Sequence, residues 1–119
     1  MDVLIVDDNT EVSHLLARVL ERAGYMVKTA DNGLAAFAEL QQTPFSVIVL
    51  DILMPFLEGK SLFRQIEADF PEMTKRVLFV TGAGDEETRE FIEGTGQPLL
   101  EKSVDAGEFV EAVRSLAHE

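Results

Sequence analysis

The chain has 119 residues, of which 46% are apolar, 27% are charged and none is cysteine, so we expect one globular domain over residues 1–119 without disulfides or a thiolate metal site. Its formal net charge of −12 disfavours direct binding to nucleic acid or to an anionic membrane. No apolar run approaches the ~18 residues of a membrane-spanning helix, and no secretion leader precedes the first apolar run, so we expect a cytoplasmic protein.

The first predicted elements are a strand and a helix. The short run of apolar, mostly β-branched residues over 3–6 is typical of a strand buried on both faces. A helix follows, because apolar residues recur at i, i+3, i+4 and i+7, and Gly24 is placed to end it. The apolar face of this helix comprises Val12, Leu15, Leu16, Val19, Leu20 and Ala23.

A second unit and a third strand come next. Residues 25–30 predict a strand and residues 31–33 a turn. A short helix over 34–42 carries Leu34, Phe37, Ala38 and Leu40, and Thr43-Pro44 ends it. The apolar residues 47–50 then predict another strand buried on both faces.

The second half repeats the alternation. A loop with Pro55 and Gly59 precedes a helix over 60–69, and residues 76–81 predict the fourth strand. A polar helix over 86–93 ends before Gly94, and residues 98–101 form a short fifth strand. The last helix begins near Asp105 and buries Phe109, Val110, Val113 and Leu116. This alternation predicts an α/β fold of (βα)₅ type, with a doubly wound, parallel, five-stranded sheet.

Acidic residues follow two of the buried strands. Asp7 and Asp8 come directly after the first run, and Asp51 comes directly after the third. Ligands of open α/β sheets bind at the carboxyl ends of strands, so we expect these carboxylates to meet. Two carboxylates about 4 Å apart repel by about 4 kcal/mol at an effective dielectric constant of about 20. The cluster therefore predicts a divalent cation, the alternative being that each acid is a solvated helix cap.

Polar residues also end the last two strands. Thr81 ends the fourth strand and precedes the small residues Gly82 and Ala83, and Lys102 follows the fifth strand. In a parallel sheet these side chains lie at the same edge as the acids.

This arrangement resembles the receiver domain of two-component response regulators. The resemblance covers the whole chain and rests on Asp7, Asp8, Asp51, Met54, Pro55, Gly59, Thr81 and Lys102. It implies a flavodoxin-like fold with strand order 2-1-3-4-5. It also implies a signalling domain that takes a phosphoryl group from a histidine kinase or histidine phosphotransfer protein and regulates a downstream effector or a fused domain. Such a domain catalyses its own phosphorylation and dephosphorylation but is no metabolic enzyme.

The resemblance implies a metal site. Asp8 would bind Mg²⁺ directly, and Asp7 would help directly or through water. Asp51 and the backbone carbonyl of Leu53 would complete the protein ligands. Mg²⁺ prefers hard oxygen ligands and accepts substrate phosphate oxygens, and Mn²⁺ is the alternative ion.

The resemblance also assigns the phosphoryl chemistry. Asp51 would be the phosphoacceptor, its carboxylate attacking a phosphohistidine to form an acyl phosphate. Lys102 would pair with the phosphoryl group. Thr81 would donate a hydrogen bond to it, moving inward once the phosphate is present.

Three residues depart from the family pattern. Ser103 stands where most receivers have a cis proline, so we expect a trans Lys102–Ser103 bond, with Ser103 or Asp105 capping the last helix. Leu99 replaces an aromatic switch residue, and Leu53 would shield the site without binding an attacking water. Residues 98–102 also resemble receivers fused to hybrid histidine kinases.

Three other functions compete with this interpretation. A Mg²⁺-dependent phosphatase of the haloacid-dehalogenase type needs a second aspartate where this chain has Leu53. A flavodoxin-like binding module needs a phosphate-binding loop where the chain has Asp7 and Asp8. A pseudo-receiver scaffold is disfavoured because the acceptor, metal and lysine positions are intact.

Overall fold

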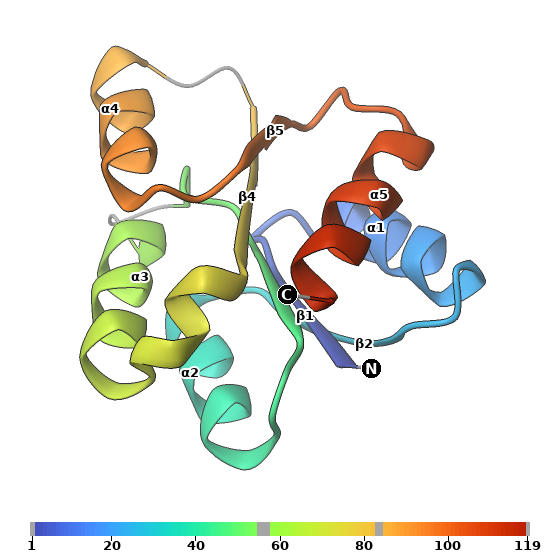
Figure 1. Cartoon of the computed structure of the whole chain (residues 1–119), viewed down its shortest axis with the longest axis horizontal. Coiled ribbons are helices and arrows are strands. Elements are labelled where there is room, and N and C mark those ends of the chain that lie inside the picture. The colour runs from blue at the N-terminus through green and yellow to red at the C-terminus, as the bar shows by residue number, and fades with distance from the viewer. Residues whose placement is uncertain (1, 55–57, 83–84, 119) are drawn as a thin grey trace.

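The computed structural model describes residues 2–54, 58–82 and 85–118. Its strands form one parallel sheet in the order β2-β1-β3-β4-β5, which confirms the predicted topology (Figure 1). The strands are β1 (Asp2–Val6), β2 (Met26–Ala30), β3 (Val47–Leu50), β4 (Val77–Thr81) and β5 (Leu99–Glu101).

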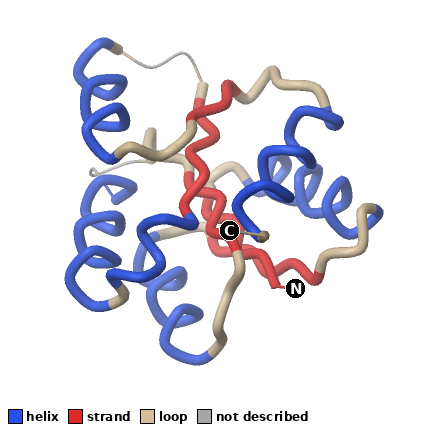
Figure 2. Tube along the Cα trace, viewed as in Figure 1, coloured by secondary structure: helices blue, strands red, loops and turns tan. Residues whose placement is uncertain are grey.

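Helices cover both faces of the sheet. In Figure 1, α1 and α5 lie on one side of the strands and α2, α3 and α4 lie on the other, and Figure 2 shows the strands enclosed between these two layers. The α-helices are α1 (Thr10–Arg22), α2 (Gly33–Gln42), α3 (Glu58–Asp69), α4 (Glu86–Thr95) and α5 (Ala106–Ala117). None of the helices in the described ranges combines the length and apolar character needed to cross a membrane.

Alternate residues of the central strands supply two separate cores. Leu4 and Val6 of β1 belong to the cluster that includes Phe63 of α3, whereas Val3 and Ile5 belong to the cluster on the α1–α5 side. These four residues of β1 are fully buried, as are most of their neighbours in β3. Because side chains alternate between the faces of a strand, each of these strands contributes to both cores.

The structure corrects several predicted boundaries. The helix α3 begins at Glu58 rather than at residue 60, so Gly59 lies in its first turn and not in a loop. The helix α4 continues through Gly94 to Thr95, and it ends at Gly96, which has a φ of 75°. A glycine in the left-handed conformation is a common end of a helix, whereas a glycine with helical backbone angles only lowers helix propensity. A 3-10 helix, η2 (Pro71–Arg76), was not predicted.

Some predicted core residues are not buried. Leu34 is 82% exposed and Leu15 is also exposed, while Val110 is only half-buried. The buried residues of α2 are instead Ala36 and Leu40. Leu34 lies two residues before Ala36, which places it on the opposite side of a helix with about 3.6 residues per turn.

Candidate functional site

The predicted site residues lie directly beyond the carboxyl ends of their strands. Asp7 donates its backbone N–H across to β2 at 3.1 Å, and Asp51 donates its N–H across to β1 at 2.9 Å. Lys102 likewise donates its N–H to β4 at 2.8 Å. These bonds extend the ladders of the sheet by one residue, so the rigid core sets where each side chain begins.

The Lys102 ammonium group contacts the acids that follow two of the other strands. Its Nζ lies 3.0 Å from Asp7 Oδ2 and 2.8 Å from Asp51 Oδ2, although β4 separates β5 from β3 in the sheet. Both carboxylate side chains are only 3% exposed and the lysine side chain is 26% exposed. Charge-assisted bonds at these distances are among the stronger polar contacts in proteins. The repulsion predicted between the acids is thus offset by an ammonium group.

The second oxygen of Asp51 is also fixed. Its Oδ1 accepts hydrogen bonds from the Thr81 hydroxyl and from the Leu53 backbone N–H, each at 2.9 Å. The Thr81 hydroxyl thus donates directly to the Asp51 carboxylate in this structure. Leu53 is 43% exposed, and it contacts the acid through its backbone N–H.

Asn9 is a site residue that the sequence reasoning missed. Its backbone N–H donates to Asp7 Oδ1 at 2.9 Å, and its side chain accepts from the backbone of Glu11 and Val12 at the start of α1. Asn9, and neither Asp7 nor Asp8, is therefore the N-cap of α1. An asparagine directly before an apolar helical pattern is the signal that could have identified it.

The three acids can hold a cation. One oxygen each from Asp7, Asp8 and Asp51 lies within 4.8 Å of the others. Asp7 and Asp51 are buried and Asp8 is exposed, so the cluster opens to solvent at one side. Three ionised carboxylates and one ammonium leave two negative charges, which a divalent cation would balance. Hard carboxylate oxygens with an open side suit Mg²⁺, which keeps several waters.

Burial and charge shift two pKa values in the site. Burial raises the pKa of the Asp7 carboxyl above its ordinary value, against the lowering effects of the Asn9 N–H and of Lys102, and the Asp51 charge also raises it. Burial acts to lower the pKa of the Lys102 ammonium, but its hydrogen bonds to Asp51 and Asp7 outweigh this and raise the pKa. Lys102 therefore stays charged, while the buried Asp7 charge opposes folding.

A hollow of about 250 Å³ lies behind Thr81, between β4, β5 and α4. Leu99 lines it and is half-buried, at the position where the family resemblance places an aromatic residue. Arg89 of α4 and Glu101 of β5 also line it, and their side chains form an ion pair with 3.7 Å between a guanidinium nitrogen and Oε1. The predicted switch position thus adjoins a space that a larger side chain could fill.

The loop after β5 has the predicted form. The Lys102–Ser103 peptide bond is trans, and Asp105 is the N-cap of α5, its side chain accepting from the Glu108 N–H at 2.9 Å. Pro55 and Ala83, which the sequence reasoning also used, lie outside the described residues.

Replacing Asp7 by asparagine should stabilise the protein in EDTA at neutral pH. The folded-state pKa of Asp7 is raised, so the stability linked to its protonation is present below the unfolded value of about 3.9 and is lost as the pH rises. The asparagine of Asp7→Asn does not ionise, so the variant does not lose this stability, and its amide oxygen can still accept from the Asn9 N–H. Urea unfolding should show a gap in unfolding free energy in favour of the variant, and this gap should be larger at pH 7 than at about pH 4.

The matched control is Asp31→Asn, which makes the same substitution at an exposed aspartate outside the site. An Asp7→Asn gap that stays flat or narrows as the pH rises contradicts the assignment.

Comparison with known proteins agrees with this geometry. The chain matches the family model of the response regulator receiver domain over residues 3–114. The response regulator receiver protein CpdR of Brucella abortus is 36% identical over 80 residues, which are 67% of this chain and 65% of that protein. The transcriptional regulatory protein ResD of Bacillus subtilis is 32% identical over 87 residues, which are 73% of this chain and 35% of that protein.

A solved structure has the same fold. The CheY-like receiver domain protein of Methanospirillum hungatei superposes with a TM-score of 0.88 at 26% identity, covering 98% of this chain and 93% of that one. The aligned segments make up less than two thirds of CpdR and about a third of ResD. The family match favours a signalling domain over the metabolic phosphatase and the flavodoxin-like binding module. The chain belongs to the response regulator receiver domain family of two-component signalling.

Proposed function

We propose that this domain takes a phosphoryl group onto Asp51 in the presence of Mg²⁺. The observation that carries the proposal is the environment of that carboxylate. It is buried, it bonds to Thr81 and Lys102, and it lies within 4.8 Å of the oxygens of Asp7 and Asp8. A buried acid beside a fixed ammonium and two further acids suits nucleophilic attack on phosphorus better than a structural role.

The transfer step follows from these contacts. A carboxylate oxygen of Asp51 attacks the phosphorus of a phosphohistidine, a phosphorus–oxygen bond forms, and the phosphorus–nitrogen bond breaks. The electron pair of that bond goes to the imidazole, which leaves with a proton from solvent. Asp51 loses its carboxylate charge because the attacking oxygen becomes part of the acyl phosphate, and the transferred phosphoryl oxygens bring their own negative charge to the site. Lys102, which Asp7 also holds, is then positioned to pair with them.

A bound metal ion would add electrostatic stabilisation to the transfer. When bound, Mg²⁺ would polarise the phosphoryl oxygens and neutralise the charge that develops on them. Asp7, Asp8 and Asp51 would hold it, together with the backbone carbonyl of Leu53, and Mn²⁺ would serve as the alternative ion. The protein supplies a fixed nucleophile, a lysine and a hydroxyl donor around that position.

Asp51→Asn should abolish labelling by a small phosphodonor and leave the protein folded. The amide keeps an acceptor oxygen for Thr81 and Leu53 but cannot form an acyl phosphate. Intact mass spectrometry after incubation with acetyl phosphate and Mg²⁺ should show one added phosphoryl group on the wild type and none on the variant. The wild-type product should be base-labile and sensitive to hydroxylamine, and EDTA should prevent its formation.

The matched control is Asp31→Asn, which removes an exposed aspartate and should label like the wild type. Normal labelling of Asp51→Asn means that the phosphoacceptor lies elsewhere.

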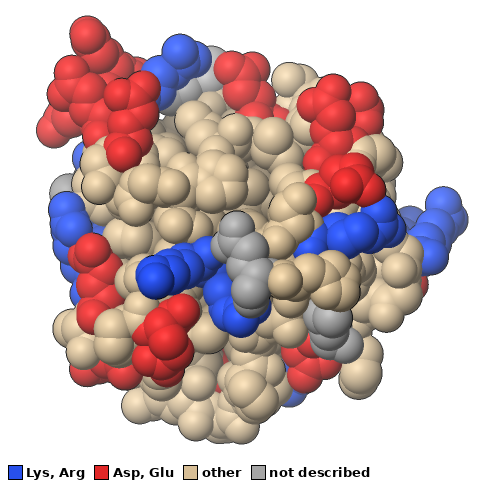
Figure 3. Space-filling model, in the orientation of Figure 1, with Lys and Arg blue, Asp and Glu red and all other residues tan. Residues whose placement is uncertain are grey.

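The partners that we propose are proteins. A histidine kinase or histidine phosphotransfer protein would donate the phosphoryl group, and an effector or a fused domain would respond. Figure 3 shows acidic side chains gathered over α4, where Glu86, Glu87, Glu90 and Glu93 are exposed. This surface repels phosphate backbones, so any binding to nucleic acid would fall to a fused domain rather than to the receiver.

We also propose that the domain switches without an aromatic rotamer. Moving a population from 1:99 to 99:1 takes about 5.5 kcal/mol of differential binding. Leu99 has no ring to rotate into the hollow behind Thr81, so this energy must come from the contacts of Thr81, Lys102 and the loop after Asp51.

Leu99→Tyr should add a response that the wild type lacks. Beryllofluoride with Mg²⁺ should then cause larger amide NMR shifts over α4, β5 and α5 in the variant than in the wild type, because the ring can enter or leave the hollow. Leu99→Met, which keeps an aliphatic side chain of similar volume, should respond like the wild type. Equal shifts in all three proteins would show that position 99 is not the missing switch.

A further inference from the structure

Gly59 packs against the backbone that carries the phosphoacceptor. It is buried in the first turn of α3, and a Cβ added there would lie 2.5 Å from Ile52 Cα, 2.7 Å from its carbonyl oxygen and 2.8 Å from its carbonyl carbon. Carbon atoms in favourable contact are about 3.5 Å apart or more. All three neighbours are backbone atoms, so no change of side-chain rotamer could relieve the contact.

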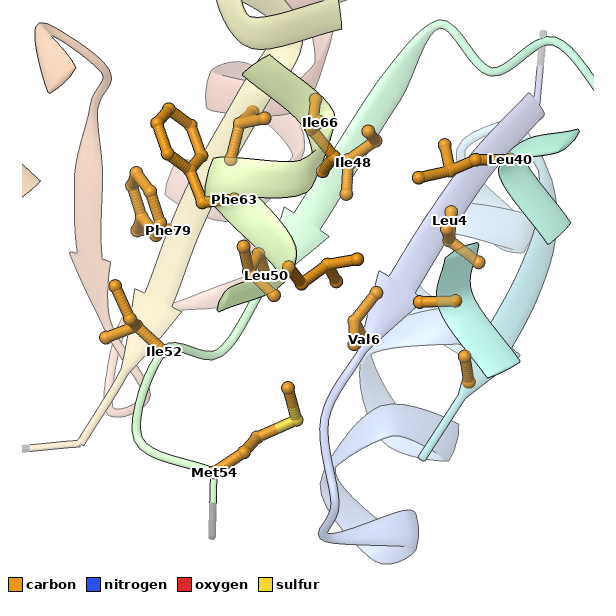
Figure 4. Close-up of a cluster of buried hydrophobic side chains, with 14 of the residues drawn as sticks. Leu4, Val6, Leu40, Ile48, Leu50, Ile52, Met54, Phe63, Ile66 and Phe79 are labelled. Atoms are coloured by element: carbon orange, nitrogen blue, oxygen red, sulfur yellow. The ribbon is translucent and has the colours of Figure 1, made fainter. Parts of the chain in front are cut away.

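The segment after Asp51 has little room to move away. The Ile52 and Met54 side chains are both buried and point in different directions, Ile52 toward the Phe79 side and Met54 toward Val6 (Figure 4). Both belong to the core cluster on the α2–α4 side of the sheet. A side chain at residue 59 would therefore have to displace packed backbone or push α3 away from the sheet.

A displacement of the Ile52 backbone would also move the amide that is hydrogen-bonded to the Asp51 carboxylate. The residue after Ile52 is Leu53, and its N–H donates to Asp51 Oδ1 at 2.9 Å. The same oxygen accepts from the Thr81 hydroxyl, while the other oxygen faces Lys102. A shift of the Leu53 amide would therefore disturb the Asp51 carboxylate, because both of its oxygens are held by hydrogen bonds or an ion pair.

We propose that Gly59 is a positioning residue for Asp51, required because α3 approaches the Ile52 backbone too closely for any side chain. The proposal rests on the phosphotransfer function proposed above. The requirement is steric rather than conformational, because the φ of Gly59 lies outside the left-handed region that favours glycine. Gly94 provides a matched comparison, since it also lies inside a helix but a Cβ there meets nothing within 4 Å.

The test compares Gly59→Ala with Gly94→Ala. Both substitutions raise helix propensity, so they differ chiefly in the contact with Ile52. Phosphorylation by acetyl phosphate at saturating Mg²⁺ should slow by about tenfold to 100-fold in Gly59→Ala, since a misplacement of about 1 Å can cost that much. Gly94→Ala should stay within about twofold of the wild type, as expected away from the site.

A second readout does not depend on phosphorylation. In EDTA, the amide NMR signals of Leu53 and Thr81 should shift in Gly59→Ala and stay unchanged in Gly94→Ala. Adding Ile52→Val to Gly59→Ala should not restore labelling, because the contact is with backbone atoms. Restoration by Ile52→Val, or wild-type labelling with unshifted Leu53 and Thr81 signals in Gly59→Ala, would overturn the proposal.

If Gly59→Ala does not fold, a smaller change to the backbone tests the same coupling. An ester in place of the Leu53 amide, introduced through the α-hydroxy acid of leucine, removes the N–H that bonds to Asp51 and leaves Gly59 in place. A loss of about tenfold in labelling supports the coupling, and wild-type labelling contradicts it. If the unaltered protein is not labelled at all, the phosphotransfer proposal fails, and the NMR comparison alone decides the role of Gly59.

Discussion

The site depends on one ammonium group between two buried carboxylates. Lys102 lies within 3.0 Å of oxygens from both Asp7 and Asp51, and without it two nearly inaccessible charges would face each other at the sheet edge. Buried charges are tolerated when they are paired and hydrogen-bonded. The arrangement leaves a net negative site that favours a divalent cation, and it keeps a cation beside the oxygen on which a phosphoryl group would sit.

The sheet makes this pairing possible. β1 and β3 are adjacent, parallel and buried on both faces, so their carboxyl ends hold Asp7 and Asp51 side by side. β4 supplies Thr81, and β5 delivers Lys102 from two strands away. The sheet thus fixes the backbone of Asp7, Asp51 and Lys102, and the lysine spans the remaining distance to the two acids through its long side chain.

Sequence reasoning predicted the parts of the fold that short-range patterns determine. The apolar run over 47–50 was bounded correctly because an aspartate follows it directly and Pro44 ends the helix before it. The strand ends also predicted that Asp7, Asp8 and Asp51 lie close together. The position of Gly59 inside α3 was not predictable, because it depends on a close approach between segments that only packing reveals. The pairing of Lys102 with two acids was missed for the same reason, since it joins residues that follow three different strands. The exposure of Leu34 depends on the helix rotation that packing selects.

A double-mutant cycle between Asp51 and Lys102 tests the account most directly. The wild type, Asp51→Asn, Lys102→Met and the double variant would be unfolded with urea at pH 7 in EDTA. We expect a favourable coupling of about 1 kcal/mol or more, since contacting charges of which one is buried couple by about 0.5–3 kcal/mol. The exposed Arg64–Glu67 pair, treated in the same way, should give about 0.3–0.5 kcal/mol. A coupling between Asp51 and Lys102 no larger than that of the exposed pair would contradict the claim that the lysine holds the site together.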